Sequence, residues 1–209
     1  MKQSSIFHIL NEVASTNNYA MAKVHAGLAT HGEAWFAHTQ FAGKGQRGRT
    51  WKSEPGKAIH LSIVLSPSLV FRVKPFYLSA LVAVCCRAFL ANKTGHNFFI
   101  KWPNDLYFRD RKAGGILIEN IFKGDTWKWA VAGMGINVNK MEFDDEAQRA
   151  VSLFDTTGQE YDVVALAKDL HQYIIEQLET TTEDSIDAIM ETYNEHLYRK
   201  GETVRLLSN

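Results

Sequence analysis

The sequence predicts a mixed α/β domain in which a β-sheet is backed by helices. Three observations support this fold class: short apolar segments of strand length recur along the chain, helical patterns separate them, and two further helical patterns lie near the C-terminus. With 209 residues, the chain is long enough for one domain with a substantial core. No internal repeat, low-complexity segment or Pro/Gly/Ser linker divides it.

The first third of the chain predicts strands around one helix. Ser15 or Thr16 stands at the N-cap position of that helix, and the segment 33–40 alternates apolar and polar residues as a half-buried strand does. The expected elements are a strand over 6–13, a helix over 15–29, a strand over 33–40 and, after a glycine-rich loop, a strand over 59–65.

The remaining two thirds predict a buried helix, three strands and two helices. The segment 73–93 is apolar on more than one face, which is typical of a buried helix. A Pro-Asn-Asp turn ends the strand that begins at Phe98, because proline interrupts a ladder. The expected elements are a helix over 73–93, strands over 98–108, 111–120 and 128–139, and helices over 162–179 and 185–198.

The composition excludes several classes of protein. Lys plus Arg equals Asp plus Glu at 23 each, so no overall basic field favours nucleic acid or a membrane surface. The N-terminus lacks the apolar segment of a signal peptide, and Arg87 interrupts the most apolar stretch. Cys85 and Cys86 are adjacent within that stretch, which favours buried thiols over a disulfide. We therefore expect a cytoplasmic protein without nucleic-acid or membrane partners.

A basic, glycine-rich loop, "GKGQRGRTW" over 43–51, is the first candidate for function. It is not a P-loop, because neither the required glycine before it nor the Ser/Thr after it is present. Glycines leave backbone N–H groups accessible to an anion, and arginine offers forked donors to phosphate. On its own, the loop is equally compatible with a solvated basic turn, and stacking of a nucleic-acid base on Trp51 is a weaker alternative.

The segment "KWPNDLYFRDRKAGGILIEN" over 101–120 strengthens the case for a ligand. Lys101, Asn104 and Asp105 gather at a strand end, where ligands of α/β sheets commonly bind. Lys112 opens the next strand, and the glycines after it would allow close approach of a ligand. A turn built by Asn104 and Asp105, with Lys112 as an exposed edge lysine, is the structural alternative.

Four segments together resemble bacterial biotin protein ligases, the enzymes that attach biotin to carboxylase carrier domains. They are "STN" at 15–17, "TQFAGKGQRGRTW" at 39–51, "KWPNDLYFRDRKAGGIL" at 101–117 and "GMGINVN" at 133–139. Their order and spacing resemble the family over about its whole catalytic domain. The resemblance implies the biotin/lipoate protein ligase catalytic-domain fold over 1–198. It also implies that biotin is the substrate, that ATP is the co-substrate and that Mg²⁺ accompanies ATP.

The resemblance also implies a role for each matching residue. Lys112 would contact both the biotin carboxylate and the α-phosphate, and Arg47 and Arg49 would neutralise the phosphates, so these three are the expected catalytic residues. No residue is expected to hold a metal, because Mg²⁺ would arrive with ATP. The expected biotin-binding residues are Ser15, Thr16, Asn17, Gln40, Gly43, Lys44, Gly45, Gln46, Trp51, Lys112, Gly115, Leu117, Gly133 and Ile136. The expected ATP-binding residues are Arg47, Arg49, Lys101, Trp102, Asn104, Asp105 and Asn137.

The chain departs from the family pattern in its loop and at its ends. Family members carry arginine where this chain has Lys44 and Gln46, and Gln46 removes a charge that helps to retain the adenylate in the family. No helix-turn-helix segment precedes Ser15, so we expect the form without an N-terminal DNA-binding domain. Residues 199–209 resemble the start of the family's small C-terminal β-barrel domain, which we expect to be truncated or absent.

The resemblance leaves two other functions open. A lipoate or octanoate transferase shares the fold, although the glycine-rich loop and "KWPND" favour biotin. A non-catalytic biotin-binding protein is the other, although such a protein would not need Lys112, Arg47 and Arg49. We expect the partner to be the biotin carrier domain of a carboxylase, and the protein to be a monomer or a homodimer.

Overall fold

A computed structural model of the chain describes residues 6–143 and 150–203. Within these residues, one seven-stranded sheet has the strand order β1-β2-β5-β9-β8-β7-β6. The pair β1 and β2 is parallel and the remaining neighbours are antiparallel. The strands are β1 (Phe7–Val13), β2 (Ala34–Gln40), β5 (Ala58–Leu65), β6 (Phe99–Lys101), β7 (Asp105–Phe108), β8 (Arg111–Lys123) and β9 (Thr126–Asn137).

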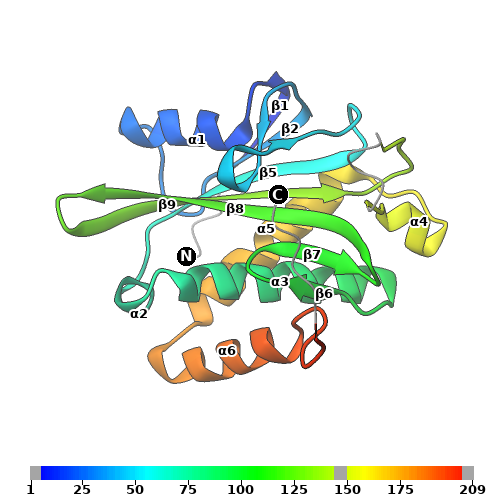
Figure 1. Cartoon of the computed structure of the whole chain (residues 1–209). Helices are drawn as coiled ribbons and strands as arrows, with labels where there is room; N and C mark the ends of the chain where they lie inside the picture. Colours follow the sequence, from blue (N-terminus) through cyan, green and yellow to red (C-terminus); the bar gives the residue numbers. More distant parts are fainter. Residues whose placement is uncertain (1–5, 144–149, 204–209) are drawn as a thin grey trace.

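Helices cover both faces of the sheet, which confirms the predicted fold class (Figure 1). Helix α1 packs on one face over β2, β5 and β9, while α3 and α5 pack on the other face and α6 packs against α3. The helices are α1 (Thr16–His25), α2 (Leu69–Val73), α3 (Phe76–Thr94), α4 (Leu153–Thr157), α5 (Val163–Thr180) and α6 (Ile186–Glu195).

The main core lies between the sheet and helices α3 and α5. Alternate residues of β5, such as Ile59 and Leu61, are fully buried there and belong to the same hydrophobic cluster as Leu78 and Val82 of α3. Helix α3 is long and apolar enough to cross a membrane by composition alone, but half of its apolar window is buried within the fold. The predicted buried helix is therefore a core helix. Cys85 within it is free and buried, and burial raises the pKa of its thiol to about 12.

Several element boundaries differ from the sequence predictions, each with a local cause. The helix predicted over 73–93 begins at Phe76, after Pro75, while Val73 ends the separate short helix α2; α3 is capped at its C-terminus by Gly95, with a φ of +72°. The strand predicted over 98–108 is the hairpin of β6 and β7, because the turn at Pro103 and Asn104 reverses the chain. The last helix ends at Glu195, three residues earlier than predicted. Residues 204–209 of the predicted C-terminal segment lie outside the described residues.

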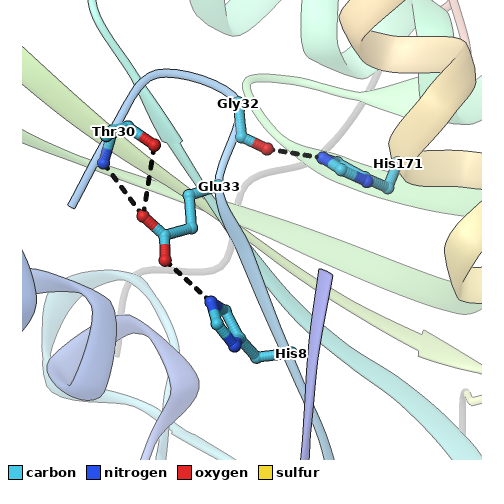
Figure 2. Close-up of polar contacts among 5 residues, drawn as sticks. All are labelled: His8, Thr30, Gly32, Glu33 and His171. Atoms are coloured by element: carbon cyan, nitrogen blue, oxygen red, sulfur yellow. Dashed lines mark hydrogen bonds and ion pairs between the residues drawn. The ribbon is translucent and has the colours of Figure 1, made fainter. Parts of the chain in front are cut away.

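The turn between α1 and β2 is held by a polar cluster (Figure 2). Glu33 accepts hydrogen bonds from His8 Nε2 at 2.7 Å and from the Thr30 backbone N–H at 3.0 Å. On the opposite side of the turn, His171 of α5 donates from Nε2 to the Gly32 carbonyl oxygen at 2.7 Å. The cluster ties β1, β2 and α5 together, and so fixes the helix and strand that carry the first residues of the candidate site.

Candidate active site

One cavity of about 540 Å³ lies on the α1 face of the sheet. Its size falls in the range of small-molecule sites, roughly 300–1,000 Å³. Four chain segments that are remote in sequence meet there: the start of α1, the end of β2 with the glycine-rich loop, the β6–β8 strands and β9. The predicted residues that line it are Ser15, Thr16, Asn17, Gln40, Lys44, Gly45, Gln46, Arg47, Arg49, Trp51, Lys101, Trp102, Asn104, Asp105, Lys112, Gly115, Leu117 and Gly133.

The first end of the cavity is built by the N-terminus of α1. Ser15 caps this helix and accepts from the Asn18 backbone N–H at 3.4 Å. The Thr16 backbone N–H and hydroxyl both donate to Gln40 Oε1, at 2.7 and 3.0 Å. Because α1 and β2 are joined in this way, a nearly buried set of neutral donors and acceptors faces the cavity.

Asn17 lies at the centre of a hydrogen-bond network that spans three strands. Its Nδ2 donates to Glu119 Oε2 at 2.9 Å and to the Leu117 carbonyl oxygen at 3.2 Å. Its Oδ1 accepts from the Ser62 hydroxyl at 2.6 Å. Ser62 and Glu119 were missed by sequence reasoning. The available signal for Ser62 was a hydroxyl within a strand that is apolar apart from His60, since a fully buried hydroxyl needs a partner.

The floor of the cavity is bare backbone of β9. A Cβ atom at Gly133 would lie 2.1 Å from Asn17 Oδ1, and one at Gly135 would lie 2.5 Å from the Trp51 ring. Glycine is therefore required at both positions for the side chains above them to pack on the sheet. Trp51 lies over Gly135 and forms an apolar wall there.

The structure corrects the position of Ile136. It was predicted to wall the cavity, but its side chain is fully buried in the main core. Successive residues of a strand point to opposite faces, so Gly133 and Gly135 face the cavity while Ile136 faces the helices. Membership of the same sequence motif did not show which of these residues face the cavity and which face the core.

The glycine-rich loop forms a small hairpin over the cavity. Its strands β3 (Gly43–Lys44) and β4 (Thr50–Trp51) pair antiparallel, and the 3₁₀ turn η1 (Gln46–Gly48) joins them. Arg47 within this turn has a φ of +54°, a backbone conformation that residues other than glycine rarely adopt. Both Arg47 and Arg49 line the cavity, which makes this end cationic.

Two further loop residues, Lys44 and Gly43, lie near residues of β8. Lys44 Nζ is 3.8 Å from Glu119 Oε1, which links the loop to the Asn17 network. Gly43 does not line the main cavity. It lines a neighbouring cavity, which is bordered by the loop on one side and by Leu117 and Glu119 on the other.

Lys112 occupies the middle of the cavity wall. Its Nζ lies 2.7 Å from Asp105 Oδ1 on the adjacent strand and 5.8 Å from the centre of the Trp51 ring. A Cβ atom on Gly115 would be 3.3 Å from the same Nζ, so the ammonium group lies against bare backbone. One cation thus borders the tryptophan wall, the glycine strand and a carboxylate at once.

Asn137 does not line the cavity, contrary to its predicted place on the nucleotide side. Its side chain is 3% exposed, and Nδ2 donates to the carbonyl oxygens of Val151 at 3.3 Å and Lys112 at 3.5 Å. The Val151 N–H also donates to the Lys112 carbonyl oxygen at 2.9 Å. Asn137 therefore supports the main chain that carries Lys112. The predicted and observed places of Asn137 differ because the sequence does not specify the direction of a side chain at the end of β9.

The hairpin of β6 and β7 forms the second end of the cavity. Asn104 Nδ2 donates to the Ile116 carbonyl oxygen at 2.5 Å, which ties the hairpin turn to β8. Lys101 Nζ donates to the Tyr107 hydroxyl at 3.1 Å. Trp102 is 66% exposed and still lines the cavity, so an aromatic face is open to a ligand at this end.

Comparison with known proteins decides the family. The sequence model of the biotin/lipoate A/B protein ligase family matches residues 10–137, more than half of the chain. The chain belongs to this family. The matched range contains every side chain of the cavity wall described above. Helices α4, α5 and α6 follow the matched part of this biotin/lipoate A/B protein ligase family member.

Individual family members resemble the chain over most of its length. The bifunctional ligase/repressor BirA of Bacillus subtilis is 32% identical over 165 residues, 78% of this chain and 50% of the relative. The biotin–[acetyl-CoA-carboxylase] ligase of Paracoccus denitrificans is 31% identical over 131 residues, 62% of this chain and 53% of the relative. The chain thus spans about half the length of these curated relatives.

A solved structure shares both fold and sequence. The biotin protein ligase of Aquifex aeolicus in complex with biotin and ATP superposes with a TM-score of 0.77 and 27% identity. The similarity covers 92% of this chain and 78% of the Aquifex protein. The predicted catalytic-domain fold of the family is therefore confirmed.

Proposed function

We propose that this protein is an ATP-dependent biotin protein ligase. It activates biotin to biotinyl-5′-AMP and transfers the biotinyl group to a lysine of a carrier domain. One observation carries the proposal: Lys112 Nζ borders the Trp51 wall and lies 2.7 Å from Asp105 on the cationic side of the cavity. A carboxylate at the end of an apolar tail and a phosphate would meet at this one cation.

Biotin fits the half of the cavity that α1 and β9 form. Its ureido group needs neutral donors and acceptors, which Ser15, Thr16 and Gln40 supply. Its apolar tail would lie along Gly133 and Gly135 beneath Trp51. The indole N–H of Trp51 is buried without an acceptor in the described part of the chain, which suits a wall that a ligand completes.

The first step joins two anions. A carboxylate oxygen of biotin attacks the α-phosphorus of ATP, the bond from the α-phosphorus to the bridging oxygen breaks, and pyrophosphate leaves with that oxygen. Lys112 lowers the repulsion between the two anions and stabilises the charge that builds up at phosphorus. Arg47 and Arg49 reach the phosphates from the loop. Mg²⁺ carried by ATP would supply charge neutralisation for the departing pyrophosphate.

The second step transfers the acyl group. A carrier lysine in its neutral amine form attacks the acyl carbon, the acyl–oxygen bond breaks, AMP leaves with that oxygen on its phosphate, and the nitrogen loses one proton to solvent. Water would destroy the mixed anhydride in the interval between the steps. The hairpin of β3 and β4 lies over the cavity and would exclude water while the adenylate waits.

The partner and location belong to the same proposal. The Paracoccus relative is named for ligation to acetyl-CoA carboxylase, which supports the carrier domain of a biotin-dependent carboxylase as the acceptor. We place the reaction in the cytoplasm, where Cys85 and Cys86 would stay reduced, as both are free in the structure.

A reaction of purified protein with ATP, Mg²⁺, biotin and a carrier domain tests the proposal. The carrier should gain the mass of one biotinyl group, and pyrophosphate should form only when biotin is present. Because the family model covers biotin and lipoate ligases alike, parallel reactions with lipoate and octanoate are required. Mass gain with lipoate or octanoate alone would replace the ligand assignment. Biotin binding without pyrophosphate would identify a non-catalytic biotin-binding protein and overturn the ligase function.

A further inference from the structure

The last helix of the described chain reaches the hairpin at the second end of the cavity. Tyr193, on α6, donates its hydroxyl to the Pro103 carbonyl oxygen at 2.8 Å. Pro103 lies in the turn between β6 and β7, and its neighbours Trp102 and Asn104 line the cavity. A hydrogen bond between residues 90 positions apart therefore ends in the turn that the ligand would contact.

Tyr193 is rigidly held and remains a donor. Its side chain is 1% exposed and packs edge-to-face on Phe76, with ring centroids 5.5 Å apart. Burial raises the pKa of its hydroxyl to about 12, so the group stays protonated at neutral pH. The ring would keep its packing if the hydroxyl were removed, which makes the hydroxyl a separable part of the residue.

The segment after α6 extends the same contact along β6. The Ile100 N–H donates to the His196 carbonyl oxygen at 2.8 Å, and the Tyr198 N–H donates to the Ile100 carbonyl oxygen at 2.9 Å. This parallel bridge places the chain beside the edge of β6, as Figure 1 shows for the segment that follows α6. Lys101 is the next residue of β6, so its backbone is held by the same bridge.

A third contact reaches the turn that precedes the strand of Lys112. The Tyr198 hydroxyl donates to Asp110 Oδ1 at 2.5 Å, and Arg199 Nη2 lies 3.3 Å from the same oxygen. Asp110 precedes Lys112 by two residues, in the turn between β7 and β8. The C-terminal segment thus touches both turns that flank β7.

We propose that residues 193–199 act as a clamp on the nucleotide side of the cavity, and that Tyr193 is its positioning residue. The clamp fixes the hairpin turn before ATP arrives, so that ordering of the turn does not weaken nucleotide binding. Tyr193 acts through the Pro103 carbonyl and does not line the cavity. It also lies outside the residues that the family model matches. The inference rests on the proposed function and extends it to α6.

The Tyr193→Phe variant tests the clamp, because it removes the hydroxyl and keeps the ring. Loss of one such hydrogen bond should raise KM for ATP about fivefold and leave KM for biotin within about twofold. Tyr161→Phe is the matched control: it removes a hydroxyl that bonds to Thr157 at 3.3 Å, away from the lining residues. Pyrophosphate release at varied ATP and varied biotin gives both KM values.

Hydrogen–deuterium exchange of the ligand-free protein provides a second readout that needs no activity. Exchange in residues 99–105 should be about fivefold faster in Tyr193→Phe than in Tyr161→Phe. Equal exchange in the two variants would overturn the clamp, and so would equal rises in both KM values. An inactive wild-type protein would instead contradict the proposed function, and the exchange comparison would still decide the clamp.

Discussion

The ammonium group of Lys112 and the carboxylate of Asp105 lie 2.7 Å apart on neighbouring strands at the wall of the cavity. Asp105 is paired in register with Gly115, whose missing side chain leaves room for both groups. The carboxylate holds the lysine in place in the ligand-free protein. An arriving carboxylate and phosphate would compete for the same cation, so this pair connects fold to catalysis.

Replacement of Lys112 by alanine should abolish most of the first step. A cation aimed at developing charge in a partly buried site is worth about 100-fold or more in rate. We expect Lys112→Ala to reduce biotin-dependent pyrophosphate release by at least about this factor. Lys93→Ala is the control, because Lys93 forms an ion pair of the same 2.7 Å length with Asp169 on the exposed surface. A near-normal rate for Lys112→Ala would remove Lys112 from catalysis.

Replacement of Gln46 by arginine should slow escape of the adenylate. Gln46 lines the cavity in the loop turn beside Arg47 and carries no charge. An added guanidinium would offer a charge-assisted hydrogen bond to the phosphate, worth about tenfold in dissociation rate. Release of radiolabelled adenylate from the preformed complex measures this rate. Gln46→Glu, with the opposite charge, should accelerate release, and identical rates for all three proteins would refute the role of Gln46.

Addition of one methyl group at Gly135 should disrupt biotin binding. The new Cβ would lie 2.5 Å from the Trp51 ring, so the indole must leave its place on β9. We expect Gly135→Ala to raise KM for biotin about tenfold or more, since the wall of the apolar tail moves. Gly124→Ala has open space around its Cβ but a φ of +58°, so it should lower thermal stability and leave KM for biotin unchanged. A normal KM for Gly135→Ala would place the tail elsewhere.

The stability of the protein should fall when the pH drops below about 6.5, the ordinary pKa of histidine. Burial lowers the pKa of His171 and of His60 below 6.5, although each donates a hydrogen bond to a backbone carbonyl. The unfolded chain therefore binds more protons than the folded chain in this range. The contribution of these two histidines to the free energy of unfolding is fully present above pH 6.5 and is lost as the pH falls toward their folded-state pKa.

Thermal melts from pH 8 to pH 5 measure this dependence, with pH values in steps of about half a unit. His171→Gln keeps a donor for the Gly32 carbonyl oxygen and does not titrate, so its melting temperature should change less with pH than that of the wild type. His25→Gln, on the exposed end of α1, should retain the full slope. If the melting temperature of His171→Gln changes with pH as steeply as that of the wild type, the buried imidazole of His171 is not the cause of the pH dependence.

Sequence reasoning located most of the cavity because its residues lie in four short motifs. Each motif carries its own chemical signal: an N-cap residue at the start of α1, glycines with cations in the loop, polar residues at the end of β6, and glycines within β9. Three predicted residues do not line this cavity: Gly43 lines the neighbouring one, and Ile136 and Asn137 differ because of the face or end of β9 that they occupy. Motif membership assigns neighbours in sequence to one site, whereas a strand directs them to opposite sides.

Residues outside the four motifs were not predicted to belong to the site. Ser62 and Glu119 bond to Asn17 across intervals of 45 and 102 residues, and Tyr193 bonds to Pro103 across 90. None of these residues stands in a pattern that indicates a ligand. Their function depends on what lies beside them in space, which the strand order of the sheet and the packing of α6 against α3 decide.

The sequence by itself determined the fold class, the buried helix α3, the family resemblance and the chemical types of side chain at the site. Local periodicity and composition carry this information, because burial and hydrogen bonding act on each segment as it forms. Only the tertiary structure decided that Lys112 meets Asp105, that Ile136 faces away, and that α6 supports the cavity. These relations join segments distant in the chain, and packing of the whole sheet sets their distances.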